Sequence, residues 1–207
     1  MNSENLLISS CYDDVIQEID EKRAVIFKVS NLGKDIGGKL VSFKYYLDFC
    51  NKTDLVVFLH DKISPQTLNS VYWFEKLYGV FEPTKFRKVL SIFQKEENVG
   101  MIGSKKFLNN EYIKPAGRFD TNNNEIMLSL MKQYNIQTQE YDFIAGCIFI
   151  VRSPLYESFF GIVNPLEVRA MLEPGNVLDI SHGTYTHAWE RLLSFIVSSQ
   201  NYKVKGI

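Results

Sequence analysis

The sequence predicts an α/β fold of one domain, residues 1–207, in which a mixed, mostly parallel sheet is flanked by helices. The stretch 25–62 reads as strand, glycine-bearing turn, helix and strand, which is the order of a right-handed βαβ unit. Its second strand, Leu55–Leu59, is apolar without alternation, as is typical of parallel strands buried on both faces. No internal repeat, low-complexity segment or linker divides the chain, and 207 residues suffice for one well-filled core.

Each element of the N-terminal half has its own signal. Apolar and β-branched runs of strand length predict strands, and apolar residues three and four positions apart predict helices. Ser64-Pro65 and Glu82-Pro83 mark breaks. The expected order is a strand at Leu6–Ser10, a helix at Tyr12–Glu21, a strand at Ala24–Val29, a turn at Asn31–Gly38, a helix at Val41–Phe49, a strand at Leu55–Leu59, and helices at Gln66–Val80 and Phe86–Glu97.

The C-terminal half continues this pattern. Ser104–Asn124 has no apolar periodicity, so we expect a long, mobile surface loop that covers the site when a ligand binds. Tyr141–Arg152 is the longest β-rich run, and Thr184 or Thr186 caps the last helix. The other expected elements are a strand at Val99–Gly103, helices at Glu125–Tyr134, Leu155–Phe160, Pro165–Leu172 and Thr184–Val197, a loop at Glu173–Gly183, and a last strand at Gln200–Val204.

The composition excludes several classes of function. The formal net charge of −1 leaves no electrostatic footprint for nucleic acid or for an anionic membrane. Cys11, Cys50 and Cys147 are far apart in apolar runs, which favours reduced core thiols in a cytoplasmic protein. The acidic start Met1–Glu4 is unlike a signal peptide, and no apolar run approaches the ~20 residues of a membrane helix. We therefore expect membrane contact only through partners.

Polar residues follow both strands of the predicted βαβ unit. The turn Asn31–Gly38 follows the first strand, and His60-Asp61-Lys62 follows the second. Ligands of open α/β sheets bind at the carboxyl ends of parallel strands. We therefore expect these two segments to face one cleft together with Glu190.

Four blocks of the chain resemble known patterns. In many GT-A glycosyltransferases an Asn-x-Gly turn precedes a helix, and the next strand ends in Asp-x-Asp. More specifically, the chain resembles the rhamnan synthesis F family of polysaccharide-assembly proteins over the range 29–204. The matching blocks are Asn31–Gly37 with His60-Asp61-Lys62, Val99–Gly103, Phe143–Arg152, and Gly183–Leu192, which reads Gly-Thr-Tyr-Thr-His-Ala-Trp-Glu-Arg-Leu.

The resemblance implies a GT-A-like, Rossmann-related fold. A complete GT-A domain has one more strand and helix ahead of Leu6, so we expect a trimmed N-terminal nucleotide-binding half or a piece of a longer arrangement. The implied activity is transfer of a sugar, with rhamnose as the candidate, from a nucleotide-sugar donor to a saccharide or lipid-linked acceptor of a bacterial cell-surface polysaccharide. The alternative is a non-catalytic carbohydrate-binding or scaffold domain that keeps this fold.

The resemblance also implies catalytic residues on the last helix. Glu190 is the candidate general base on the acceptor hydroxyl, a role that suits a partly buried carboxylate. His187 lies three residues before Glu190 and hence on the same helical face. A structural pairing of Glu190 with Arg191 or His187 is the other interpretation.

The remaining candidates would bind the donor or a metal. Asp35 either caps a helix or accepts from a sugar hydroxyl, and Gly146 either admits a sugar or marks a bulge. His60 and Asp61 are the candidate ligands of a divalent metal, Mn or Mg, although Asp-x-Asp itself is absent, and a lysine beside them could neutralise phosphate instead. The predicted donor-binding set is Asn31, Gly33, Asp35, His60, Lys62, Gly146 and Arg152.

Overall fold

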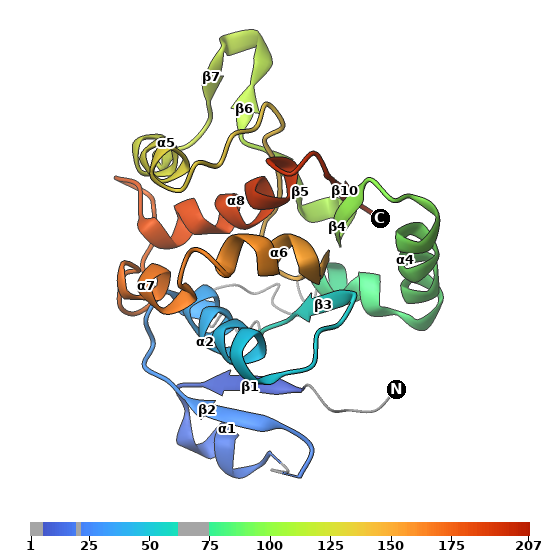
Figure 1. Ribbon diagram of the computed structural model, residues 1–207. Coiled ribbons are helices and arrows are strands. Elements are labelled where there is room, and N and C mark those ends of the chain that lie inside the picture. Colours follow the sequence, from blue (N-terminus) through green and yellow to red (C-terminus); the bar gives the residue numbers. More distant parts are fainter. Residues whose placement is uncertain (1–5, 20–21, 62–74) are drawn as a thin grey trace.

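The computed structural model describes residues 6–19, 22–61 and 75–207 as an α/β structure with mixed sheets (Figure 1). Its larger sheet has four strands in the order β10, β4, β9, β3. β10 is parallel to β4, whereas β9 runs antiparallel to both β4 and β3. The bounds are β3 Leu55–Phe58, β4 Val99–Gly103, β9 Phe149–Arg152 and β10 Lys203–Gly206.

A smaller parallel sheet lies near the bottom of the molecule in Figure 1. It pairs β1 (Leu7–Ser10) with β2 (Val25–Lys28), and α1 (Asp13–Gln17) connects the two strands. The Ser9 hydroxyl on β1 donates to the Gly38 carbonyl of the long helix α2 at 3.0 Å, and its oxygen lies 2.8 Å from the Ser42 hydroxyl oxygen. These contacts fix α2 against this small sheet.

The strand pairing corrects two expectations. Among the described strands, only the pairs β1–β2 and β10–β4 are parallel, so the sheets are mixed but not mostly parallel. β3 is an edge strand paired antiparallel with β9, and it shares no ladder with β2. The reason is a turn at Gly146-Cys147, which divides the expected strand 141–152 and sends β9 back between β3 and β4.

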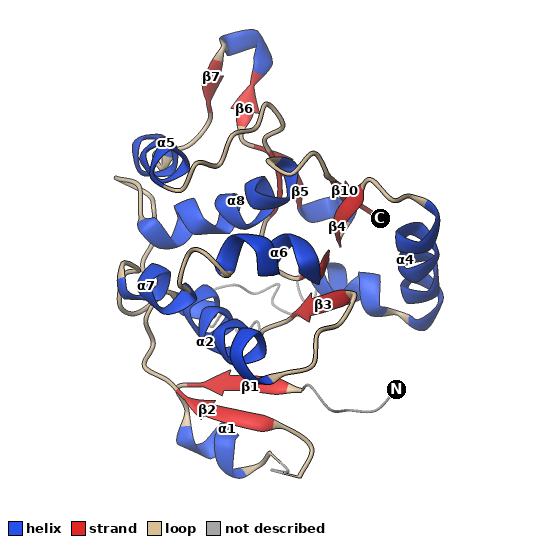
Figure 2. Ribbon diagram, in the orientation of Figure 1, coloured by secondary structure: helices blue, strands red, loops and turns tan. Residues whose placement is uncertain are grey.

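Helices surround the larger sheet, as Figure 2 shows in blue. α2 begins at Lys34, so the five residues 34–38 that we expected in a turn form its first turns. Gly33 permits this early start because it adopts a left-handed φ of 75° at the N-cap. The helices are α2 Lys34–Phe49, α4 Pro83–Lys95, α5 Asn124–Gln133, α6 Ser153–Phe160, α7 Pro165–Ala170 and α8 Tyr185–Ser198, with a 3₁₀ turn η1 at Gly79–Phe81.

The segment Ser104–Asn124 is ordered by backbone pairing instead of forming one long loop. β5 (Leu108–Asn110) pairs antiparallel with β8 (Asp142–Ile144), and β6 (Tyr112–Ile113) pairs with β7 (Arg118–Phe119). The latter hairpin projects from the top of the molecule in Figure 1. The 3₁₀ turn Lys105–Phe107 leads from β4 into β5, and the 3₁₀ turn Lys114–Ala116 connects β6 to β7. The mobility that we expect of this segment stays a prediction.

The core lies on both faces of the four-stranded sheet. Ile102 and Ile150 pack with α4 on one face, whereas Met101, Phe149 and Val151 face α2, α6 and α8 on the other. Trp189 and Met101 are fully buried, as expected of core residues. Trp73 and most of the expected helix Gln66–Val80 lie outside the described residues. No helix in the described ranges is long and apolar enough to cross a membrane.

Candidate functional site

The buried lysine Lys39 of α2 lies at the centre of the residues that the sequence singled out. Its side chain is 7% exposed, and its ammonium donates to a carboxylate oxygen of Asp35 at 2.7 Å. The ammonium also donates to the Cys147 carbonyl at 2.7 Å and lies 2.9 Å from Nδ1 of His60. Lys39 therefore connects the first turns of α2, the end of β3 and the turn between β8 and β9.

The contact with Lys39 determines the tautomer of His60. An ammonium group can only donate hydrogen bonds, so Nδ1 of His60 accepts and the ring hydrogen lies on Nε2. The Tyr78 hydroxyl donates to the His60 carbonyl and holds the end of β3 from the other side. His60 is thus neutral and oriented as a donor through Nε2.

Glu190 of α8 binds the same turn. One carboxylate oxygen accepts from the Gly146 backbone N–H at 2.6 Å, and the other accepts from the Arg191 guanidinium at 2.7 Å. Gly146 and Cys147 both have left-handed backbones, with φ of 79° and 51°. Glycine adopts this conformation without strain, but Cys147 does not, and strained residues cluster at functional sites. Gly146 therefore lies in a turn and not at a bulge within one continuous strand, and its N–H is bound by the candidate general base. Its role in sugar binding stays a prediction.

Behind Glu190 lies a buried ion pair that the sequence did not reveal. Arg191 Nε donates to Glu111 at 3.2 Å, and these side chains are only 9% and 2% exposed. Thr121 donates to the second oxygen of Glu111 at 2.6 Å, and the guanidinium stacks over Phe143. Both Glu111 and Thr121 belong to the segment without periodicity, so no local signal could have identified them.

His187 lies one turn before Glu190 on α8. Its Nδ1 is 2.6 Å from the Thr184 hydroxyl, and its Nε2 is 3.3 Å from the ammonium of Lys34 and 4.0 Å from Asp179. Burial, followed by the positive charge of Lys34, lowers the pKa of His187 below its usual 6.5, against the opposing effect of Asp179 and Glu190. The imidazole is therefore held neutral, with Nε2 as an acceptor towards Lys34.

The loop between α7 and α8 supplies two more carboxylates. Glu173 accepts from the backbone N–H groups of Tyr185 and Thr186 and from the Thr186 hydroxyl, and so caps α8 together with Thr184. Burial alone would raise the pKa of Glu173, but these hydrogen bonds outweigh it and lower the pKa below its usual 4.5.

Asp179 of the same loop accepts from the buried Asn123 at 2.8 Å. Burial would raise its pKa, but the hydrogen bond from Asn123 outweighs burial and lowers the pKa below the usual 3.8. Neither Glu173, Asp179 nor Asn123 was expected from the sequence, because their partners lie far along the chain.

The structure brings together some of the predicted residues and separates others. Gly33 donates its N–H to the Glu173 carbonyl at 2.8 Å, and the Asn31 carbonyl accepts from Gly175 at 2.8 Å, so both backbones tie the start of α2 to this loop. Asp35, His60 and Gly146 join Glu190 through Lys39 and the 146–147 turn. Lys62 lies outside the described residues, and Asp61 is exposed.

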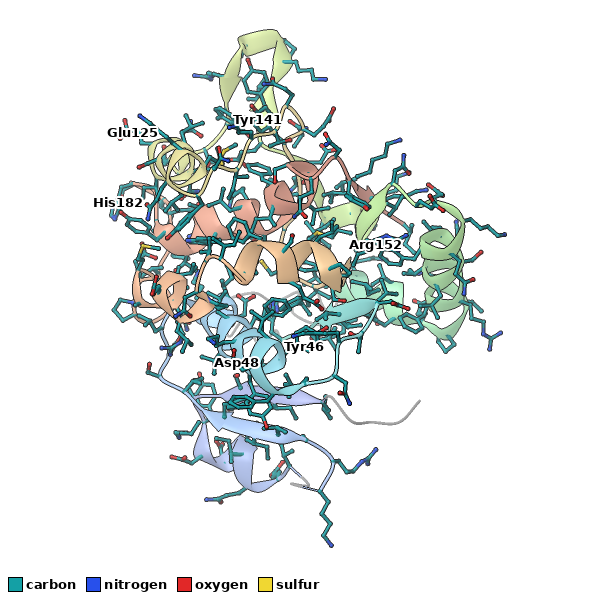
Figure 3. All side chains as sticks on the ribbon, in the orientation of Figure 1. Tyr46, Asp48, Glu125, Tyr141, Arg152 and His182 are labelled. Carbon is teal, nitrogen blue, oxygen red and sulfur yellow. The ribbon has the colours of Figure 1, made fainter. Side chains whose placement is uncertain are left out.

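Arg152 is the predicted donor-binding residue that lies apart. It is the last residue of β9 and pairs with Leu55 at the start of β3, whereas His60 follows the other end of β3. Its guanidinium donates to the carbonyls of Phe93 at 2.6 Å and Val99 at 2.8 Å. Figure 3 shows Arg152 beside α4, far from His182 near the start of α8. Arg152 therefore anchors α4 to the sheet instead of lining the site.

The donor set does not fit the divalent metal that the resemblance suggested. Among the described side chains, no three His, Cys, Asp or Glu residues gather closely enough to hold a metal ion. Of the predicted ligands, Asp61 is exposed, and His60 lies against the ammonium of Lys39, which it shares with Asp35.

Comparison with known proteins adds no assignment: no family model matches this chain, and neither a curated protein nor a solved structure matches it.

Proposed function

We propose that this chain is a GT-A-like glycosyltransferase of the rhamnan synthesis F type, which moves a sugar, with rhamnose as the candidate, from a nucleotide-sugar to a cell-surface polysaccharide acceptor. One observation supports this proposal above the others. Glu190 and the motif residues Asp35 and His60 come from distant parts of the chain, yet they meet around one strained turn at Gly146-Cys147.

Glu190 is the general base in this proposal. Its carboxylate is 18% exposed and is oriented by the Gly146 N–H and by Arg191. Each carboxylate oxygen retains a further lone pair that can accept a hydrogen bond. Glu190 would take the proton of the acceptor hydroxyl as that oxygen bonds to the anomeric carbon, while the nucleoside diphosphate departs with the electrons of the glycosidic bond.

Two neighbouring side chains have supporting roles. The ammonium of Lys34 brings positive charge to the start of α2, where the diphosphate of a donor would be attracted. Neutral His187 holds this ammonium through Nε2 and is itself fixed by Thr184. The proposed division is an acceptor side at Glu190 and a donor side at Lys34.

The alternative is a non-catalytic carbohydrate-binding domain, and one observation favours it. A groove of about 650 Å³ lies at the far end of α8, away from Glu190. Its volume falls in the usual range for small-molecule sites. Polar side chains and one aromatic ring, groups that suit a saccharide, make up most of its lining, together with one valine: Gln137, Thr138, Gln139, Glu140, Asp142, Ser198, Asn201, Tyr202, Lys203 and Val204.

A thermal-shift screen separates the two functions. A ligand that binds only the folded state raises the Tm. For the transferase, we expect nucleotide-sugars and nucleoside diphosphates to raise the Tm, and Lys34→Met to reduce that shift. Stabilisation by oligosaccharides alone, with no response to any nucleotide or nucleotide-sugar, would support the binding domain and reject the transferase.

A further inference from the structure

The contacts of Lys39 satisfy its ammonium completely. This group has three hydrogens to donate, and three acceptors surround it at 2.7, 2.7 and 2.9 Å. They are a carboxylate oxygen of Asp35, the carbonyl oxygen of Cys147 and Nδ1 of His60. Burying a charged lysine is unfavourable unless it is paired and hydrogen-bonded, as it is here.

These three acceptors are also the kinds of atom that bind divalent cations. Ca²⁺ and Mg²⁺ take carboxylate and carbonyl oxygens, and imidazole nitrogen suits transition metals. We propose that the ammonium of Lys39 fills the cation position of this site, so that the domain binds its ligand without a divalent metal. The identity of the ligand as a nucleotide-sugar rests on the function proposed above. The role of the Lys39 ammonium as a built-in cation is independent of that function.

Charge and protonation both oppose a metal beside Lys39. An ion placed between Asp35 and His60 would lie next to the buried ammonium, and like charges at such distances repel strongly in a poorly solvated environment. In the tautomer fixed by Lys39, Nδ1 of His60 is occupied and Nε2 carries a hydrogen. Neither ring nitrogen then offers a lone pair to a metal.

The wild-type protein provides the first test. We expect its Tm to be the same in EDTA, in 1 mM MnCl₂ and in 1 mM MgCl₂, and calorimetric titration with Mn²⁺ to show no stoichiometric binding. Binding of one Mn²⁺ per chain that is weakened by Asp35→Asn would overturn the proposal. The wild-type measurements need no variant, and Asp35→Asn serves only to assign any Mn²⁺ that binds to this site.

Lys39→Ala provides the second test, because it leaves the three acceptors around a vacated cation position. We expect its Tm in EDTA to fall by roughly 6–20 °C, the usual effect of leaving a buried charge uncompensated in a domain of this size. Mn²⁺ or methylammonium should then restore part of the loss in this variant alone. If the variant unfolds in EDTA, circular dichroism should show refolding on addition of either cation.

Lys44→Ala is the matched control, since Lys44 lies on the same helix in an i,i+4 pair with Asp48 that is more exposed. We expect its Tm to differ from that of the wild-type protein by less than about 2 °C and to be unchanged by either cation. Failure of every cation to stabilise Lys39→Ala would show that the acceptors do not form a cation site and would refute the proposal.

Nucleotide-sugar binding distinguishes this inference from the proposed function. Binding by the wild-type protein in EDTA supports both. Binding that requires Mn²⁺ supports the transferase but overturns the built-in cation. If no nucleotide-sugar binds under any condition, the transferase is rejected, and the Mn²⁺ titration and the Lys39→Ala rescue decide the cation site alone.

Discussion

Replacing Glu190 by glutamine separates a catalytic role from a structural one. The amide has nearly the same shape as the carboxylate, so α8 should keep its packing. The amide oxygen can still accept from the Gly146 N–H, which lies 2.6 Å from Glu190. In the wild-type protein the other carboxylate oxygen accepts from the Arg191 guanidinium at 2.7 Å. In the variant the amide nitrogen takes the place of that oxygen, so two hydrogen-bond donors face each other and this bond is lost.

The structure allows the size of both effects to be estimated. Loss of a hydrogen bond between charged groups costs about 1.5–3 kcal/mol. At about 2–4 °C per kcal/mol for a domain of this size, the Tm should fall by roughly 3–12 °C. Because an amide cannot take a proton at neutral pH, turnover per folded molecule should also fall by about a hundredfold or more if Glu190 is the general base.

The assay measures the Tm and the turnover of a nucleotide-sugar on the same sample of Glu190→Gln. Glu157→Gln is the control, because Glu157 lies on α6 and accepts from Tyr46 at 2.6 Å, a bond that an amide oxygen can keep. It should change neither quantity appreciably. A lower Tm with unchanged turnover per folded molecule would reject the catalytic role, and an unchanged Tm would refute the hydrogen-bond reasoning.

Three further predictions concern the helix starts. Gly33→Ala should destabilise the protein by about 1–2 kcal/mol or more in urea unfolding, because φ is 75° and the new Cβ would lie 2.2 Å from Leu172; no loss would contradict the fold at this turn. Since the pKa of Glu173 lies below 4.5, its stabilising effect is complete above that pH and is lost below it. Glu173→Gln should therefore flatten the acid-induced fall in unfolding free energy, and an equally steep fall would argue against the cap. His187 should titrate below 6.5 by NMR, and Lys34→Met should raise its pKa; an unchanged value would exclude their contact.

Local patterns predicted most elements because burial repeats along a helix or strand. The apolar spacing of 184–197 corresponds to α8, and the run at Val99–Gly103 corresponds to the fully buried β4. The same reasoning failed at Tyr141–Arg152, where a continuous apolar run conceals a turn. Gly146 was the local signal, since glycine readily adopts a left-handed backbone. At the non-glycine Cys147 the left-handed backbone is favoured by the Glu190 hydrogen bond and by the packing of both halves in different sheets.

The residues of the candidate site could likewise be predicted in part from the sequence, whereas their partners could not. The sequence by itself determined which polar residues end the strands and begin the helices, so Asp35, His60 and Glu190 could be selected from motif and position. Only the tertiary structure decided their partners, since Lys39 meets a carbonyl 108 residues away and Arg191 meets a glutamate 80 residues away. A buried charge must find its counter-charge wherever the fold brings one, and no periodicity along the chain records that choice.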